Sequence, residues 1–302
     1  MTLAITGGTG FVGQALIDLA ERRAVKIRSL ARRIPEDRRG VEWIQGDLAD
    51  TAALARLVDG ADAVIHIAGQ VRANDPQEFE GANVTGTLNV IEAALEARVP
   101  RFVFVSSLAA REPALSRYGA SKLRAEKLVA ASGLDWTIVR PPAVYGPRDG
   151  EMLDLFEMAT MGVVPMPKRG HASLIHVGDL ARLLLAVLPS SDDTTGKVFE
   201  PDDGKPGGWE HREFAKAIGW AMGRHPFVPR LSKGMLNFAA RMDRLLRRNG
   251  AKLTPDRVGY MVHPDWVSSP DARPPSHMWQ PRIPTREGLK ATAKWYRDNK
   301  WL

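Results

Sequence analysis

An α/β fold built on a doubly wound parallel sheet is predicted by the arrangement of apolar segments along the chain. Over residues 1–140, short apolar segments alternate with stretches of helical periodicity. Several of these segments are continuously apolar and rich in β-branched or aromatic residues, which is typical of parallel strands buried on both faces. Strands that alternate with helices imply right-handed crossover connections. After Arg140 prolines and glycines become frequent, so a smaller mixed lobe is expected to follow the sheet.

The expected elements follow in chain order. The strands are expected at Thr2–Thr6, Val25–Leu30, Val41–Ile44, Ala63–Ile67, Phe102–Val105 and Trp136–Val139. The helices are expected at Phe11–Arg22, Asn83–Ala97, Ser116–Ala131 and Val177–Leu188. We expect two domains: residues 1–190, completed by the segment around 171–200, and a mostly helical lobe over 191–302 that binds substrate.

Composition narrows the class of protein. Hydrophobic residues make up 44% of the 302 residues, which is enough for a sizeable core. No apolar run reaches the ~18 residues that a membrane-spanning helix needs. The chain contains no cysteine, which excludes disulfides, thiolate metal sites and cysteine nucleophiles, and we expect no metal site. The first residues lead into a strand without a signal-peptide pattern, so a cytoplasmic protein is expected.

Positive charge is concentrated at the C-terminal end. Residues 231–302 hold 14 of the 42 Lys and Arg but only 6 of the 35 Asp and Glu. They therefore carry all of the net charge of +7. Such asymmetry can indicate nucleic acid, an anionic membrane surface or an acidic substrate, or simply a solvated face. We expect no nucleic-acid partner, because the basic residues form no recognised nucleic-acid-binding motif.

An amphipathic helix is predicted over Leu231–Arg248 within this basic region. Ser232 near its start and Gly250 just beyond it are helix-boundary signals. Its apolar residues recur at helical spacing: Leu231, Met235, Phe238, Met242 and Leu245. Its other faces are basic, with Lys233, Arg241, Arg244, Arg247 and Arg248. The favoured interpretation is that the apolar stripe packs onto the protein, and the alternative is peripheral contact with a membrane surface.

The strongest local motif is the glycine-rich turn Thr6–Gly13, which follows a strand and opens a helix. Gly7 allows the tight turn, Gly10 lets the backbone approach a pyrophosphate, and Gly13 lets the helix pack close to the strand. The helix N-terminus then presents free N–H groups and the positive end of its dipole to phosphate. This context predicts a Rossmann-type, dinucleotide-binding domain.

The end of the second strand indicates which dinucleotide. An acidic residue there would bind the ribose 2′-hydroxyl of NAD, whereas a basic residue accommodates the 2′-phosphate of NADP. There is no Asp or Glu between Ala24 and Pro35, but the same segment contains three arginines: Arg28, Arg32 and Arg33. NADP(H) is therefore favoured over NAD(H), with a solvated strand end as the alternative.

A second chemical signal is Tyr118 and Lys122, four residues apart on one helix face. A free tyrosine has a pKa near ~10, and a nearby ammonium favours the phenolate and lowers that pKa toward a useful range. Ser106 and Ser107 follow the strand Phe102–Val105, where α/β sheets place ligand-contacting residues. A serine hydroxyl there could hydrogen bond to a substrate oxygen or cap a helix.

These motifs occur together with others in a consistent order. They are TGGTGFVG at 6–13, GDL at 46–48, VIHIAG at 64–69, NVTGTLN at 83–89, FVFVSS at 102–107, YGASK at 118–122, RPPAVYGP at 140–147 and IHVGDLA at 175–181. In this set and spacing the chain resembles the extended short-chain dehydrogenase/reductase superfamily, also called the NAD-dependent epimerase/dehydratase family, over roughly residues 1–190.

The resemblance implies a role for individual residues. It places Tyr118 as proton donor or acceptor, Lys122 on the nicotinamide ribose, Ser107 on the substrate oxygen, and Asn83 as support for the active-site helix. The implied cofactor contacts are Gly7, Thr9, Gly10, Phe11, Val12, Arg32, Arg33, Asp47, Leu48, Ala68, Gly69, Tyr118, Lys122 and Pro141 to Val144. His66 and His176, which lie in apolar segments, are interpreted as structural.

The substrate is less tightly constrained, because function depends on the site rather than the fold. Six of the eight tryptophans lie between Trp209 and Trp301, and the C-terminal segment resembles sterol- and lipid-type members, including ceramide-reductase-like ones. We expect an NADP(H)-dependent oxidoreductase for a hydrophobic, lipid- or steroid-like carbonyl, such as a 3-oxo-ceramide. The alternatives are a nucleotide-sugar epimerase or dehydratase with tightly bound NAD, and a non-catalytic nucleotide-binding assembly protein. A homodimer is expected by analogy with relatives that pair through the helices of Asn83 and Tyr118.

Overall fold

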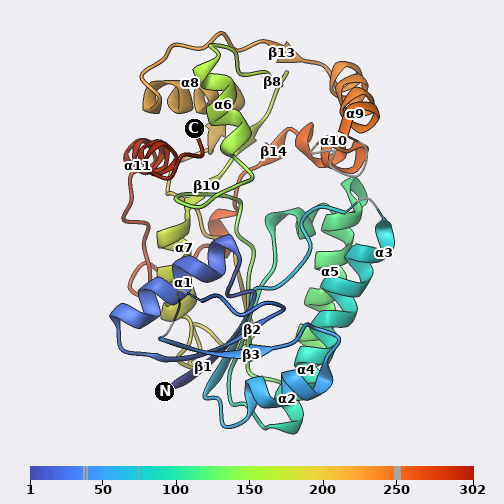
Figure 1. Ribbon diagram of the computed structural model, residues 1–302, viewed down its shortest axis with the longest axis vertical. Helices are drawn as coiled ribbons and strands as arrows, with labels where there is room; N and C mark the ends of the chain where they lie inside the picture. The colour runs from blue at the N-terminus through green and yellow to red at the C-terminus, as the bar shows by residue number, and fades with distance from the viewer. Residues whose placement is uncertain (37, 39, 74, 248–252) are drawn as a thin grey trace.

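A seven-stranded parallel sheet forms the centre of the first part of the chain (Figure 1). The computed structural model describes residues 1–36, 38, 40–73, 75–247 and 253–302. In spatial order the strands are β11 (Lys197–Phe199), β6 (Trp136–Val139), β5 (Phe102–Val105), β4 (Ala63–His66), β1 (Thr2–Thr6), β2 (Lys26–Ala31) and β3 (Val41–Gln45). Every neighbouring pair is parallel, which confirms the predicted doubly wound sheet.

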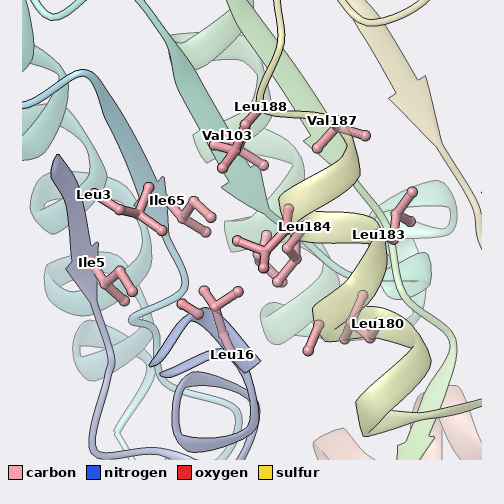
Figure 2. Close-up of a cluster of buried hydrophobic side chains, with 14 of the residues drawn as sticks. Leu3, Ile5, Leu16, Ile65, Val103, Leu180, Leu183, Leu184, Val187 and Leu188 are labelled. Atoms are coloured by element: carbon pink, nitrogen blue, oxygen red, sulfur yellow. The ribbon is translucent and has the colours of Figure 1, made fainter. Parts of the chain in front are cut away.

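Helices cover both faces of this sheet. One face carries α1 (Phe11–Arg22) and α7 (Val177–Ala186), and the other carries α2 (Thr51–Val58), α4 (Gly86–Glu96) and α5 (Arg117–Ala131). Each face has its own hydrophobic core. Figure 2 shows the core on the first face, where side chains of β1, β4 and β5 meet those of α1 and α7. Burying such side chains contributes about 1.5–3 kcal/mol each, which is why the central strands β1, β4, β5 and β6 read as largely apolar runs.

Short helical segments connect these elements near the carboxyl ends of the strands. They are α3 (Pro76–Phe79), a π-helical turn η1 (Glu80–Thr85), and two 3₁₀ turns, η2 (Leu108–Arg111) and η3 (Pro113–Leu115). The helix expected over Asn83–Ala97 therefore begins as a π-helix and continues as α4.

The remaining elements form a second lobe beyond the carboxyl ends of the strands (Figure 1). Its strands are β7 (Ala143–Tyr145), β8 (Met166–Pro167), β9 (His171–Ala172), β10 (Leu174–His176), β12 (Trp209–Glu210), β13 (Arg230–Leu231) and β14 (Asp265–Trp266). Its helices are α6 (Leu153–Thr160), α8 (His211–Ala221), α9 (Lys233–Arg247), α10 (Pro255–Met261), η5 (Pro270–Ala272) and α11 (Thr285–Asp298). A separate core joins α6, α8 and α11 around Phe156, Ile218 and Tyr296. Within the ranges given above, every helix is too short or too polar to cross a bilayer.

The amphipathic helix forms as α9, but the favoured interpretation of its apolar stripe is wrong. Met235, Phe238 and Met242 are exposed, and α9 instead packs through Leu236 and Ala240. These two residues lie on a different face of the helix. Of the predicted stripe, only Leu231, which precedes α9, packs partly against this small core, and the stripe on the helix itself is left outside. Arg248 and Gly250, which belonged to the predicted helix and its end, lie outside the described residues.

Candidate active site

The glycine-rich turn brings the end of β1, the end of β4 and the start of α1 into close contact. Gly7 has φ +76°, and a Cβ on it would lie 2.7 Å from the main-chain nitrogen of Ala68. A Cβ on Gly13 would lie 2.1 Å from the carbonyl oxygen of Gly7. Side chains are therefore excluded at both positions by backbone atoms. A Cβ on Gly10 would meet only the Gly7 carbonyl, at 3.3 Å, so this part of the turn can be approached by a ligand.

The other residues of the turn lie at the start of α1. Phe11 begins the helix and is half-buried, Val12 packs partly on the core, and Thr9 is exposed. The side-chain amide of Gln14 donates to the Thr9 carbonyl at 2.8 Å, which ties the turn to the helix. The turn is thus rigidly held from within the chain, as a phosphate-binding loop requires.

The arginines in and just after β2 are not equivalent. The Arg28 guanidinium donates to Glu42 and to main-chain carbonyls at the end of α2, including that of Asp59 at 2.6 Å. Arg28 is therefore committed to holding α2 against the sheet. Arg32 and Arg33, in contrast, are exposed just beyond the end of β2. The same strand contacts the glycine turn, because a Cβ on Gly8 would lie 2.2 Å from Oγ of Ser29.

Two further predicted cofactor segments are anchored by hydrogen bonds. The Asp47 carboxylate accepts from the main-chain N–H of Ala49 at 2.8 Å, and Asn89 donates to the Leu48 carbonyl at 2.7 Å. At the end of β4, the Thr6 hydroxyl accepts from the N–H of Ala68 at 3.2 Å, next to the exposed Gly69. Loop positions that are fixed in this way can line a binding site without moving.

Ser107, Tyr118 and Lys122 are brought together at the carboxyl end of β5. Ser107 follows β5 and hydrogen bonds with the Tyr118 side chain on α5. Ser107 also accepts from the N–H of Ala109 at 3.2 Å, so it caps η2 as well. One turn further along α5, the Lys122 ammonium donates to the Val105 carbonyl at 2.8 Å. Ser106, the other candidate, instead donates to the buried carboxylate of Glu126 and has a structural role.

The pKa of Tyr118 differs from the expectation based on its spacing to Lys122. Burial raises the pKa of Tyr118 to about 12, and the hydrogen bond to Ser107 is the interaction that opposes this. Burial also lowers the pKa of Lys122 to about 8. The expected lowering of the tyrosine pKa by the ammonium is therefore wrong, because burial dominates the pKa of Tyr118 and the Lys122 ammonium donates to the Val105 carbonyl instead.

Asn83 connects the cofactor side of the site to α5. Its side chain, buried in the π-helical turn η1, donates to the Gln70 carbonyl and to the Ser121 hydroxyl, both at 2.9 Å. Its carbonyl oxygen accepts from the N–H of Gln70 at 2.7 Å. Single π-turns inside helices are frequent at functional sites. Asn83 therefore orients the segment after β4 and the helix that carries Tyr118.

The segment after Arg140 closes another side of the site. The Pro141 carbonyl accepts from the N–H of Leu108 at 3.0 Å, so it lies beside the turn that contains Ser107. Val144 lies in β7 and pairs with Ile175 in β10. The segment is thereby held between the sheet and the second lobe.

The two histidines have hydrogen-bond partners that account for them. His66 is buried between the hydroxyls of Thr6, at 2.6 Å, and Thr87, at 2.9 Å, and its pKa is lowered to about 3 by burial. His176 caps α7 by accepting from the N–H of Gly178 at 3.0 Å. Both arrangements agree with structural roles.

Several residues around Tyr118 were not singled out from the sequence. Its ring neighbours that of Phe79, with centroids 6.1 Å apart, and that of Tyr260 in α10, with centroids 6.5 Å apart. Beside them, Glu151 forms ion pairs with Arg72, through two guanidinium nitrogens, and with Arg257 at 3.2 Å. These residues come from distant segments without a shared motif, so no local pattern could have assembled them.

The chain is similar to known proteins of one enzyme family. A model of the NAD dependent epimerase/dehydratase family matches residues 3–200. A ceramide reductase of Caulobacter vibrioides is 36% identical over 99% of this chain and 96% of its own length. A 2-alkyl-3-oxoalkanoate reductase of Stenotrophomonas maltophilia is 29% identical over 96% of this chain and 98% of its own. The fold matches that of MoeE5 in complex with UDP-glucuronic acid and NAD, with a TM-score of 0.76, 22% identity and 99% of both chains covered.

The family model matches residues 3–200, which is well over half of the chain, and the ceramide reductase is similar over nearly its full length. The chain therefore belongs to the NAD dependent epimerase/dehydratase family, the extended short-chain dehydrogenases/reductases, and is an NAD(P)-dependent oxidoreductase.

Proposed function

We propose that the protein is an NADP(H)-dependent reductase or dehydrogenase that acts on a hydrophobic, lipid-like ketone or the corresponding alcohol. The observation that carries this proposal is the pairing of the Tyr118 and Ser107 side chains at the carboxyl end of β5, with Lys122 one helical turn away. Two hydroxyls at one point can both hydrogen bond to a single substrate oxygen.

The residues present fit a dinucleotide. Backbone atoms exclude side chains at Gly7 and Gly13, while Gly10 leaves the turn open, as close approach of a pyrophosphate requires. Asp47, Leu48, Ala68 and Gly69 would border the rest of the dinucleotide, and Pro141 to Val144 its nicotinamide end. Arg32 and Arg33 are exposed on the strand that contacts the turn, which supports binding of a 2′-phosphate. When bound, the nicotinamide supplies or accepts the hydride at its C4.

The protein's own groups handle the proton and the substrate oxygen. With its pKa raised to about 12, Tyr118 carries its proton at neutral pH and can donate it to a carbonyl oxygen as that oxygen gains charge. Ser107 donates a hydrogen bond to the same oxygen. The Lys122 ammonium stabilises the phenolate that Tyr118 becomes when it loses its proton. In the oxidative direction the same groups act in reverse.

The surroundings of Tyr118 support an apolar substrate. Phe79 and Tyr260 each place an aromatic ring next to that of Tyr118. Two full-length relatives are named as reductases, one of a ceramide and one of a 2-alkyl-3-oxoalkanoate. A long-chain 3-oxo lipid, of the 3-oxo-ceramide type, is therefore the favoured substrate class.

The test is an NADPH-consumption assay with a long-chain 3-oxo amide or ester in detergent micelles. Tyr118→Phe should lower kcat by about 10²–10⁴-fold while NADPH affinity, measured by calorimetry, stays close to wild type. Tyr260→Phe is the matched control, because it keeps the ring beside Tyr118 and removes only a hydroxyl. A Tyr118→Phe variant with wild-type turnover would exclude the assignment. Tightly held NAD together with stabilisation by UDP-sugars would instead favour an epimerase.

A further inference from the structure

One face of α9 is apolar and uncovered. Five large side chains on this helix are exposed, among them Phe238 at 67%, Leu245 at 73% and Leu246 at 78% of their maximum. Met235 and Met242 complete the set. Residues at this spacing lie along one side of a helix. Apolar side chains scattered singly on a surface are common, whereas a contiguous group of this size marks an interaction site.

The contacts of α9 show why its apolar face is not buried in the protein. The helix packs on α10 through Leu236 and Ala240, which meet Val258 in a small separate core. At 100° per residue, Leu236 and Ala240 lie on a different side of the helix from the five exposed apolar side chains. In the described part of the chain, no element covers the exposed face.

The charges on α9 indicate what kind of surface it fits. Lys233, Arg241, Arg244 and Arg247 are exposed on the same helix, where Asp243 is the single acidic residue. Arg247 pairs with Asp243 at 3.3 Å. Of these, Arg241 borders the apolar face and the others lie on the remaining sides of the helix. An apolar face combined with Lys and Arg on the polar faces is the pattern of a helix that lies in the interface of an anionic bilayer, with its basic side chains reaching the headgroups. The net positive charge of residues 231–302 complements the same surface.

The position of α9 links this surface to the active site. The helix rests on α10, and α10 carries Tyr260, whose ring lies beside Tyr118. In Figure 1, α9 and α10 lie together at the end of the molecule remote from the N-terminus. The apolar face of α9 therefore belongs to a helix that packs directly on the segment bordering Tyr118.

We propose that α9 is an interfacial helix that docks the enzyme on an anionic membrane surface, from which it takes its lipid substrate. The choice of substrate rests on the proposed function, but the docking does not. Phe238, Leu245 and Leu246 enter the headgroup region, and Arg241 and Arg244 contact anionic headgroups.

The test is co-sedimentation of the full chain with vesicles, without substrate or cofactor. Vesicles of equal parts phosphatidylglycerol and phosphatidylcholine should bind the protein, and pure phosphatidylcholine vesicles should bind it much more weakly. The double variant Phe238→Ser/Leu245→Ser should weaken binding by about tenfold or more. Arg241→Gln and Arg244→Gln should each weaken it by about fivefold on the mixed vesicles. The matched control is Leu88→Ser/Leu95→Ser, two exposed leucines with the same spacing on α4.

The outcomes separate docking from catalysis. Equal binding of the wild type and the α9 double variant would overturn the proposal, even if the enzyme reduces ketones in micelles. So would a concentration-dependent dimer in light scattering that the α9 variant abolishes, because the face would then be an interface between two copies. Loss of vesicle binding with unchanged turnover on a short, water-soluble ketone would support it.

Discussion

Lys122 on α5 donates its ammonium to the main-chain carbonyl of Val105 at the end of β5, over 2.8 Å, while lying 4.4 Å from the centre of the Phe104 ring. The lysine is almost fully buried, and its hydrogen bond goes to a neutral carbonyl. Burial therefore lowers the pKa of Lys122 to about 8. Because its charge is poorly compensated, the Lys122 ammonium can readily bind a ribose hydroxyl or the phenolate of Tyr118.

This relationship has a consequence for stability against pH. In the unfolded chain the lysine titrates near 10.5, so between pH 8 and pH 10.5 the folded protein binds fewer protons than the unfolded one. The free energy of unfolding of the wild type should therefore rise through this window, by roughly 3 kcal/mol. Lys122→Met should lack this rise in urea unfolding followed by circular dichroism. Lys127→Met, exposed on the same helix, should retain it. Parallel pH profiles for the wild type and Lys122→Met would contradict the low pKa.

The cofactor preference is expected to depend on Arg32 and Arg33. Both are exposed beyond β2, whereas Arg28 is held by the end of α2. Replacing Arg32 and Arg33 by alanine should weaken NADPH binding by about 10–100-fold, since each can donate a charge-assisted hydrogen bond to a 2′-phosphate, and should leave NADH binding unchanged. Calorimetric titration with both cofactors measures this, with Arg22→Ala on α1 as an exposed control. Equal affinity of the wild type for NADH and NADPH would exclude the preference.

The sheet could be predicted from the sequence because central strands such as β4 and β5 are buried along their whole length and appear as apolar runs. The glycine turn was equally clear, since Gly7 requires a positive φ and Gly13 meets a backbone oxygen. The surroundings of Tyr118 could not be predicted, because they bury its hydroxyl and include Tyr260, which reaches it from the second lobe through a contact that no local spacing encodes. For the same reason, the sequence could not show which of Arg28, Arg32 and Arg33 would be engaged by another part of the chain.

Asp149 is a buried carboxyl group that the proposed chemistry does not use. One oxygen accepts from the N–H of Glu151 at 2.7 Å, while the other is buried with no hydrogen-bond partner in the described residues. Burial raises the pKa of Asp149 to about 7. Between pH 3.8 and pH 7 the folded protein therefore binds more protons than the unfolded chain, so stability falls as pH rises through this window.

Asp149→Asn should remove this loss of stability. The asparagine keeps an acceptor for the N–H of Glu151 and cannot ionise. Relative to the wild type, its free energy of unfolding should increase between pH 4 and pH 7, by on the order of 4 kcal/mol, and then level off. Asp192→Asn, at an exposed position, should show no such change in urea unfolding at the same pH values. If the difference between Asp149→Asn and the wild type does not vary with pH, the carboxyl group is already ionised in acid and its burial is compensated.

Gly259 determines how closely α10 approaches η3, the turn that leads into α5. A Cβ on Gly259 would lie 2.3 Å from the carbonyl oxygen of Leu115, which is a backbone atom and cannot swing aside. Just before it on α10, the Asp256 carboxylate accepts from the N–H of Arg117 at 2.7 Å, at the start of α5. Gly259→Ala should push α10 outward and move the Tyr260 ring away from Tyr118.

The expected result of Gly259→Ala is a KM for the hydrophobic ketone raised by about tenfold, since the displaced ring no longer lines the site and roughly 1.4 kcal/mol of contact is lost. NADPH affinity should be unchanged, because the glycine turn lies on a separate part of the molecule. Gly234→Ala on α9 is the matched control: its Cβ would come no closer than 3.9 Å to Ser232, and alanine favours a helix. Steady-state kinetics in detergent micelles distinguish the two variants. An unchanged KM for Gly259→Ala would show that α10 does not border the substrate, and the route from α9 to Tyr118 would then have to pass elsewhere.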